Sequence, residues 1–199
     1  MTTKAFKGRL EDRRFLTGAG KYVGDITLPR QAYMALVLSP HAHADIKSID
    51  TTAAIAMPGV IDALTGADLV ADGLGSVPPF FMPSLWGGPN GHATLRPILI
   101  SDRVRCVGER VAIVIAETAQ AARRAAEAVA IDYKPLEAVT DPEQALTAQA
   151  PRVWPDCPTG NLSVLLPMGD KEKTAAAFVA AVHTVRLRMV TPRVAPTSL

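Results

Sequence analysis

The stretch VRCVGERVAIVIAETAQAARRAAEAVAIDY, residues 104–133, decides the fold of this 199-residue chain. Within it, residues 111–116 (VAIVIA) form an apolar run that predicts a β-strand. Thr118 then stands where its hydroxyl can cap the alanine-rich residues 119–130, whose composition strongly favours a helix. Residues 130–133 (AIDY) follow as another strand. The order strand, helix, strand predicts an α/β unit.

Two further strands are predicted upstream of this unit. Residues 33–38 (YMALVL) form an unbroken apolar run that ends at Ser39-Pro40, which predicts a buried strand followed by a turn. Residues 60–65 (VIDALT) predict the next strand. Between the two, residues 50–52 (DTT) carry side-chain oxygens that can cap a short helix, which Pro58-Gly59 would end.

A long loop is predicted over residues 72–97, which contain ten glycines and prolines. Such a density of backbone breakers excludes regular helices and strands. The loop also carries Phe80, Phe81 and Trp86, which can pack against another surface. Loops longer than about 15 residues in compact domains often serve a function. We therefore interpret residues 77–86 as a docking arm.

The last third of the chain predicts shorter elements. Asp141-Pro142 is a typical start of a short helix, with Asp as the cap and Pro in the first turn. A proline-rich link covers residues 151–158, and Asp170 can cap a helix over residues 171–181. Residues 182–190 (VHTVRLRMV) alternate apolar and polar side chains, which predicts a half-exposed strand.

Composition and charge exclude several classes of protein. Hydrophobic residues make up 48% and charged residues 20% of the chain, so we expect a folded domain rather than a disordered or fibrous chain. The net charge is +2, and the basic residues are scattered, which gives no case for nucleic-acid binding. The longest uncharged apolar run, near residues 111–116, is far shorter than the roughly 20 residues that span a bilayer, so no membrane segment is expected.

The cysteines and the N-terminal region indicate the compartment. Residues 17–25 are polar and rich in glycine, whereas an export signal would need an apolar stretch there. Cys106 and Cys157 suit no close-spaced metal motif and are expected to be reduced thiols. Residues 161–163 (NLS) fit a glycosylation sequon, which has no meaning without secretion. We therefore expect a cytoplasmic protein.

Two histidines and a group of glycines were considered as binding sites. His41 and His43 would share one face of an extended strand, but a zinc or copper site needs further ligands that nothing nearby supplies. Residues 18–20 (GAG) with Gly24 miss the spacing of a dinucleotide-binding motif, and no strand precedes them. A phosphate-binding loop needs a glycine several residues before its lysine, and no glycine stands at that position before Lys21. Turn and core-edge roles are the favoured interpretations of both groups.

The pair Gly108-Glu109 precedes the 111–116 strand. Gly108 permits a tight or left-handed turn, and Glu109 could bond to Arg105, Arg110 or backbone amides. A catalytic carboxylate would need a partner that the sequence does not show. Cys106 beside this turn is interpreted as a small buried residue. A nucleophilic Cys106 would require a base such as His183 or His92, and the sequence brings neither close.

Four segments together resemble the molybdenum hydroxylase large subunit, the family of xanthine dehydrogenases, aldehyde oxidases and aerobic carbon monoxide dehydrogenases. They are GRLEDRRFLTGAGKYVGDITLP at 8–29, LSPHAHADIKSID at 38–50, VRCVGERVAIVIAET at 104–118 and TPRVAP at 191–196. Departures are Leu38, where the family often has Arg, and Arg110, where it more often has Pro. Residues 197–199 (TSL) also differ from the family's continuation.

The resemblance implies an α/β (α+β) fold called the a/b hammerhead domain, with a mixed sheet and packed helices over residues 1–150. Residues 151–199 would form a linker, helix and strand leading toward the molybdopterin-binding region. In the family that later region holds the molybdenum–molybdopterin dinucleotide and the catalytic base. The resemblance therefore assigns no catalytic, cofactor-binding or metal-binding residue to this sequence, and it implies that this chain alone binds no cofactor.

The function implied by the resemblance is the hammerhead portion of a molybdopterin-dependent oxidoreductase that hydroxylates aldehydes, N-heterocycles or carbon monoxide. We expect a truncated or split subunit that is not catalytic alone and whose partners are a molybdopterin-binding subunit with FAD and iron–sulfur subunits. The alternatives are a free-standing binding or structural module, a non-functional gene remnant, and a small hydrolase using Cys106. The sequence leaves open whether the chain by itself is an enzyme.

Overall fold

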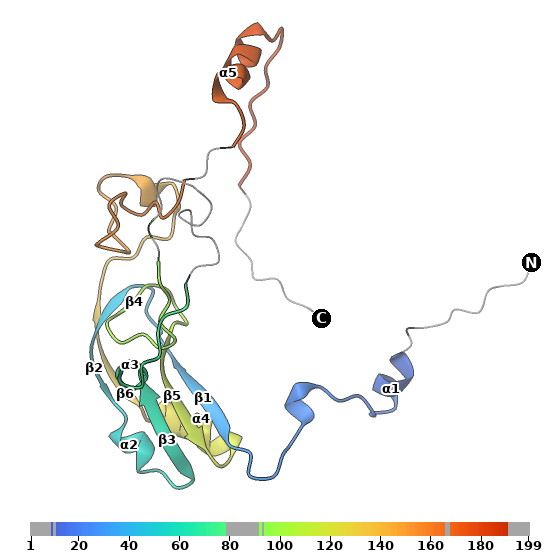
Figure 1. Cartoon of the computed structure of the whole chain (residues 1–199), viewed down its shortest axis with the longest axis vertical. Coiled ribbons are helices and arrows are strands. Elements are labelled where there is room, and N and C mark those ends of the chain that lie inside the picture. The colour runs from blue at the N-terminus through green and yellow to red at the C-terminus, as the bar shows by residue number, and fades with distance from the viewer. Residues whose placement is uncertain (1–8, 10, 79–91, 93, 166–167, 191–199) are drawn as a thin grey trace, which may run out of the picture.

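The computed structural model describes residues 9, 11–78, 92, 94–165 and 168–190. Two three-stranded sheets form the body of the protein, and two segments extend away from it, one leading to the N-terminus and one carrying α5 (Figure 1). The first sheet has the order β1-β5-β3 and the second the order β4-β2-β6. The strands are β1 (Tyr33–Leu38), β2 (Ala44–Asp50), β3 (Val60–Thr65), β4 (Arg103–Val104), β5 (Arg110–Ala116) and β6 (Ala130–Pro135).

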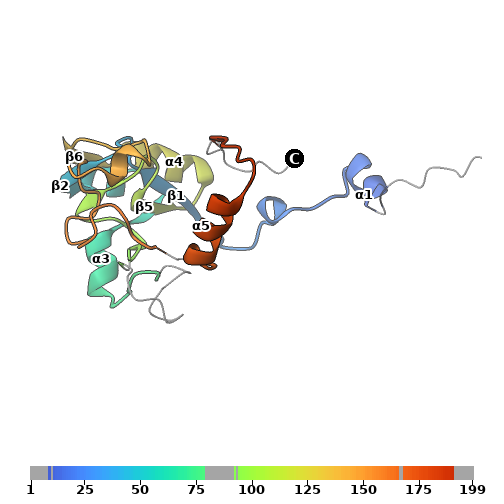
Figure 2. The same cartoon turned by 90° about the horizontal axis from the view of Figure 1, so that it is seen from above.

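Short helices connect and cover these strands. Only α4 packs across the first sheet, where it contacts all three strands among the described residues. Figure 2 shows α4 beside β1 and β5, and Figure 1 shows α5 standing apart from the sheets. The helices are α1 (Asp12–Leu16), η1 (Val23–Asp25), α2 (Thr52–Ile55), α3 (Gly66–Ala71), α4 (Ala119–Glu127), η3 (Gln144–Leu146) and α5 (Lys171–Ala180).

Helix α4 begins where the sequence predicts. The Thr118 hydroxyl accepts a hydrogen bond from the Ala121 amide at 3.1 Å, which satisfies one of the free amides of the first turn. Ala122 and Ala125 point toward the sheet and are buried. Small side chains at these two positions let the helix approach the strands closely. Arg123 and Arg124 occupy the exposed side.

Two buried clusters form the core, and β5 contributes to both. One cluster joins Val111 to residues of the second sheet and its neighbours, namely Ala44, Ile100 and Val104. The other joins Val114 to α4, α2 and β3 through Ala125, Ala54 and Ala63. Burial of these apolar surfaces is the main favourable contribution to folding. Strand β5 therefore holds the two sheets and the helix layer together.

The α/β (α+β) fold class is confirmed, and the sheet arrangement needs one correction. The family resemblance implies a mixed sheet, whereas every described strand pair is antiparallel. The two strands that flank α4 also lie in different sheets, β5 in the first and β6 in the second. The chain therefore passes through α4 from one sheet to the other, and β5 and β6 do not pair with each other. A local strand–helix–strand order does not fix which strands pair.

Strand β1 has the predicted bounds but is not buried on both faces. Tyr33, Ala35 and Val37 are half-buried on the face that α4 covers, whereas Met34, Leu36 and Leu38 are 61%, 42% and 50% exposed. Because α4 covers one face only, the second apolar face of β1 stays open to solvent. Across the register, Met34 lies opposite Ile115 and Leu36 lies opposite Ile113, and both isoleucines are half-buried.

The other predicted elements have mixed outcomes. The first short helix forms as α2, which begins at Thr52, where the Thr52 amide donates to the Asp50 carboxylate. The short helix predicted after Asp141 forms as η3, and Asp170 caps α5 by accepting from the Lys173 amide at 2.9 Å. The strand predicted over residues 182–190 is not formed, because a strand needs a neighbour and none of the described strands lies against this extended segment. Helix α3 was not predicted, although its Thr65–Asp68 capping pair was readable in the sequence.

The docking arm predicted over residues 77–86 lies almost entirely outside the described residues, and this includes Phe80, Phe81 and Trp86. At the base of the loop, Val77 and Arg96 exchange two backbone hydrogen bonds of 2.8 and 3.1 Å as an isolated antiparallel bridge. The described helices include none with the length and apolar character needed to cross a membrane.

Replacing Ala125 with Leu tests the close approach of α4 to the sheet. Ala125 is fully buried against Val114, so the larger side chain should overpack the core and lower the free energy of unfolding by about 1–3 kcal/mol. Arg124→Leu adds an apolar side chain to the exposed side of the same helix and should change stability by less than about 0.5 kcal/mol. Equal urea midpoints for the two variants would contradict this packing.

Candidate functional site

His41 and His43 lie in the turn before β2. The His43 side chain is buried, and its Nδ1 lies 2.7 Å from the carbonyl oxygen of Glu137. Because a carbonyl only accepts hydrogen bonds, Nδ1 carries the hydrogen and donates it. The His41 ring lies 4.8 Å from the Tyr133 ring, tilted by 60°. The pair thus fastens the turn to the end of β6 and the residues after it, which is the turn and core-edge role that the sequence favours.

The Gly108-Glu109 turn is bonded to the Ser-Pro segment that follows β1. Gly108 has a φ of +86°, the left-handed conformation that the sequence predicts. Its amide donates to the Ser39 carbonyl at 2.9 Å, and the Ser39 amide donates to the Glu109 carbonyl at 2.8 Å. The Glu109 carboxylate accepts from the Arg105 amide. Glu109 is therefore engaged with the backbone, one of the structural roles expected for it.

Cys106 and His43 line the same cavity, of about 250 Å³, next to this turn. Sequence reasoning did not pair them, because residues 63 positions apart meet only in the folded chain. The cavity lies between the turn before β2, the Gly108 turn and the segment after β6. Its lining includes Ala42, His43, Arg105, Cys106, Thr140 and Val153.

The two histidines that the sequence offered as bases for Cys106 lie elsewhere. The His92 Nε2 is 3.5 Å from the Asp156 carboxylate, and the His92 ring lies 6.1 Å from the Trp154 ring. His183 follows α5 and is exposed. Neither residue lines the cavity beside Cys106. The hydrolase hypothesis thus loses the pairs on which it was based.

The electrostatic surroundings of Cys106 favour the protonated thiol. Desolvation of the thiol raises its pKa, the Glu109 carboxylate raises the pKa further, and Arg96 opposes them by lowering it. A thiol that keeps its proton is a weak nucleophile at neutral pH. Cys106 is also exposed, contrary to the buried position that we predict from its residue type, whereas Cys157 is 2% exposed. The sequence could not separate the two, because burial depends on distant segments.

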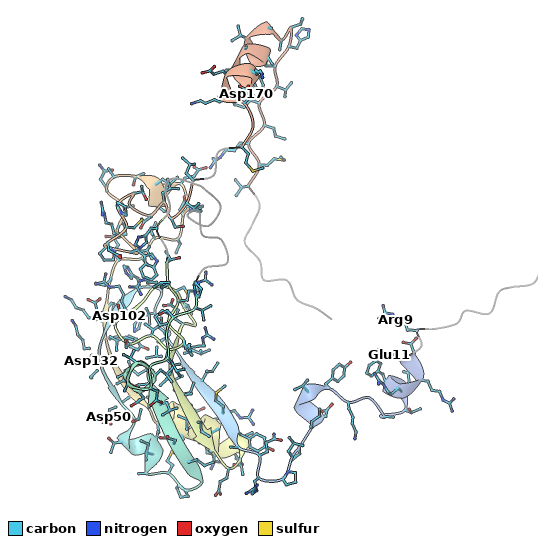
Figure 3. The ribbon with its side chains drawn as sticks, viewed as in Figure 1. Arg9, Glu11, Asp50, Asp102, Asp132 and Asp170 are labelled. Atoms are coloured by element: carbon cyan, nitrogen blue, oxygen red, sulfur yellow. The ribbon has the colours of Figure 1, made fainter. Side chains whose placement is uncertain are left out.

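Arg105 joins the hammerhead-like body to the segment after β6. Its guanidinium lies 3.9 Å from the centre of the Trp154 ring, a cation–π contact. It donates from Nε to the Val153 carbonyl at 3.2 Å and from Nη1 to the Arg103 carbonyl at 2.7 Å. Asp102, labelled in Figure 3, lies 3.6 Å from Nη2 and is mostly exposed. The sequence named Arg105 only as a possible partner of Glu109.

Asn161 fixes the fold of the segment that carries Trp154. Its Oδ1 accepts from the Val153 amide at 2.9 Å, and its Nδ2 donates to the Ala145 and Pro151 carbonyls, both at 3.0 Å. The side-chain amide of the apparent sequon is therefore fully used by the backbone. A half-buried side-chain amide that satisfies three backbone groups is costly to replace.

The glycine-rich segment at residues 18–24, a candidate nucleotide-binding motif in the sequence, packs against an aromatic side chain. The space in which a Cβ of Gly20 would stand is taken by the Phe15 ring, whose nearest carbon would be 2.5 Å away. Gly18 forms the turn after α1, and Phe15 stacks on Tyr22 with ring centroids 5.6 Å apart. In the described ranges, no three side chains of His, Cys, Asp or Glu gather into a possible metal site. Our prediction that the chain holds no catalytic or cofactor-binding residue stays a prediction.

Residues 17–137 match the model of the family described as aldehyde oxidase and xanthine dehydrogenase, a/b hammerhead domain. The chain belongs to this family. The body formed by the two sheets and α4 lies within the matched residues, so it is the hammerhead domain. The Gly108 turn, the Ser39 segment and Arg105 belong to the same matched range.

Similar proteins extend well beyond this domain. The chain is 38% identical to the carbon monoxide dehydrogenase large chain of Afipia carboxidovorans over 87% of its own length and 21% of the relative. It is 37% identical to the corresponding chain of Hydrogenophaga pseudoflava over 95% of its length and 24% of the relative. A solved structure of reconstituted carbon monoxide dehydrogenase from Oligotropha carboxidovorans superposes with a TM-score of 0.72 at 36% identity, covering 89% of this chain and 22% of that one. The chain spans about a fifth to a quarter of the length of these relatives.

Gly108→Val tests the turn that holds Ser39 in place. A β-branched residue resists a φ of +86°, so the free energy of unfolding should fall by about 1 kcal/mol or more. Gly24 has no atom within 4 Å of an added Cβ and is not among the positive-φ glycines. Gly24→Val should therefore leave the melting temperature nearly unchanged. A Gly108→Val protein with the same melting temperature as the wild type would show that the turn does not need glycine.

Alkylation of Cys106 tests the electrostatics of its cavity. Glu109→Gln keeps an acceptor for the Arg105 amide but removes the charge that raises the thiol pKa, so Cys106 should react faster with iodoacetamide at pH 8. Arg96→Gln removes the opposing charge and should slow the reaction. Peptide mass spectrometry reports Cys106 separately from Cys157. Rates that move together in both variants would contradict the assigned electrostatics.

Proposed function

We propose that this chain supplies the hammerhead portion of a molybdopterin-dependent hydroxylase and acts there as a scaffold rather than as the site of chemistry. The observation that supports the scaffold role is the use of its polar side chains. His43 donates to the Glu137 carbonyl, Glu109 accepts from the Arg105 amide, and Asn161 bonds to three backbone groups. Hydrogen bonds from these side chains to the chain's own backbone stabilise the fold.

The domain division is part of this proposal. Residues 1–150 form the hammerhead unit, and residues 151–199 lead toward the molybdopterin-binding region. The family model over residues 17–137 supports the first unit. The Arg105–Trp154 contact and the bond from Asn161 to the Ala145 carbonyl support a rigid start of the second, because they tie residues 151–161 to the first unit.

The partner in this proposal is the molybdopterin-binding region of the hydroxylase, assembled with FAD and iron–sulfur subunits. An open apolar strip on β1, consisting of Met34, Leu36 and Leu38, is one surface that such a partner would cover. Exposed contiguous apolar surface is typical of protein–protein contacts. The same contacts would form whether the partner region follows in the same chain or belongs to a separate subunit.

The assembled enzyme would hydroxylate an aldehyde, an N-heterocycle or carbon monoxide. The molybdenum–pterin dinucleotide, held by the partner region, would supply the redox chemistry. The residues of this chain would position that region and exclude water from the covered strip. We place the assembly in the cytoplasm, where free thiols such as Cys106 and Cys157 stay reduced.

Affinity purification of the tagged chain from its native cells tests the proposed function. We expect the eluate to contain a molybdopterin-binding partner region and molybdenum in a fixed ratio to the chain, measured by peptide identification and metal analysis. The physical reason is the open apolar surface, which a partner would bury. A monodisperse, metal-free chain without such a region would contradict the proposal and favour an independent module.

Charge placed on the β1 strip tests which surface the partner covers. Met34→Lys should reduce the recovered molybdenum at least about tenfold, since burying an unpaired ammonium group costs several kcal/mol. Val70→Lys is the matched control, because Val70 is an equally exposed apolar residue on α3, 71% exposed against 61% for Met34. Equal recovery for the two variants would exclude the strip as a contact surface.

A further inference from the structure

Residues 182–190 (VHTVRLRMV) form an extended segment that lies outside the core. It follows α5 in the part of the chain that stands apart from the two sheets (Figures 1 and 2). Its apolar side chains are among the most exposed of the described residues: Val182 88%, Val185 92%, Leu187 75%, Met189 80% and Val190 76%. Exposure of so many large apolar side chains in one stretch is costly in water.

The side chains of this segment separate by type. In an extended chain, neighbouring side chains point to opposite faces, so residues two apart share a face. Val185, Leu187 and Met189 then share one face with His183 at its start, and this face is mainly apolar. Thr184, Arg186 and Arg188 form the centre of the other face, which is polar and positively charged there and has Val182 and Val190 at its ends. This is the pattern of a strand with one face against a core and one face in solvent.

The backbone of the segment has no hydrogen-bond partner in the part of the chain that the structure describes. No hydrogen bond joins the amides or carbonyls of residues 183–190 to any other residue that the structure describes. An extended stretch with free amides and carbonyls can pair with the edge of another sheet. The contacts that it does make are peripheral: Arg188 pairs with Glu143 at 2.8 Å on an exposed surface, and Thr184 to Arg186 lie beside Phe178 and Val179 of α5. Exposed ion pairs of this kind contribute little to stability.

The comparisons place this segment in the region shared with long relatives but outside the hammerhead model. That model ends at residue 137. A match over 95% of the chain can omit only about ten residues, so the match to the Hydrogenophaga pseudoflava chain includes residues 182–188 wherever it starts. That relative is about four times longer, which provides additional structure against which such a segment can pair.

We propose that residues 183–189 add as a strand to an exposed sheet edge of the molybdopterin-binding region and so couple this chain to it. The inference rests on the function proposed above and identifies a second contact with the same partner. The pairing edge would bury Val185, Leu187 and Met189 against apolar side chains. On the opposite face of the partner sheet, acidic residues would lie across from Arg186 and Arg188, since opposite charges across a strand pair stabilise the pairing.

Hydrogen–deuterium exchange on the assembled enzyme and on the isolated chain tests the pairing. The expected result is that amides of residues 183–189 exchange at least about tenfold more slowly in the assembly, with the amides of α1 serving as an internal reference. An assembly that contains molybdenum but leaves these amides exchanging as in the isolated chain overturns the strand pairing and leaves the proposed function intact. Absence of any such assembly overturns both.

Proline variants separate backbone pairing from contact through side chains alone. Leu187→Pro removes an amide and disrupts the ladder, so recovery of the partner region should fall at least about tenfold, and more than for Leu187→Ala. Val107→Pro is the matched control, because Val107 is exposed and precedes Gly108 at the turn position that favours proline. Equal recovery with Leu187→Pro and Leu187→Ala would overturn a backbone-paired strand.

Discussion

The backbone hydrogen bonds that join β5 to β1 on one edge and to β3 on the other organise this protein. Val111 and Val114 of the same strand enter different buried clusters, one shared with the second sheet and one shared with α4. A central strand that is paired on both edges loses its pairing only if the whole sheet opens. The positions of α4, of the second sheet and of the turn before β5 all follow from this strand.

The turn before β5 connects this strand to segments that are distant in sequence. Gly108 in its left-handed conformation lets the backbone meet Ser39 in two hydrogen bonds, and Arg105 just before it reaches the carbonyl of Val153. These contacts link three segments that are far apart in sequence. Their polar groups are used for this linkage.

The surfaces that the fold leaves open are apolar on β1 and alternate between apolar and basic on residues 182–190. Hydrophobic burial is the dominant favourable term both in folding and in association. A domain that leaves one apolar face of its edge strand β1 exposed is therefore suited to a position within a larger assembly. Both surfaces are contact surfaces in the function proposed above.

The candidate site shows where reading the sequence reached its limit. The conformation of Gly108 and the backbone bond of Glu109 were predictable, because glycine before a strand signals a turn and a carboxylate beside it seeks nearby amides. The shared cavity of Cys106 and His43 and the stacking of Arg105 on Trp154 were not predictable. They join residues 63 and 49 positions apart, and no local pattern encodes such distances.

The sequence by itself determined the positions of β1, β3, β5, α4, β6 and α5, because periodicity, alanine content and capping residues such as Thr118 and Asp170 act within a few residues. The family segments also determined the α/β hammerhead class. Only the tertiary structure decided that the strands form two antiparallel sheets, that β1 is open on one face and that residues 182–190 lack a neighbour. Strand pairing and burial are decided by segments distant in sequence, and an alternating stretch becomes a strand only when another strand supplies the hydrogen bonds.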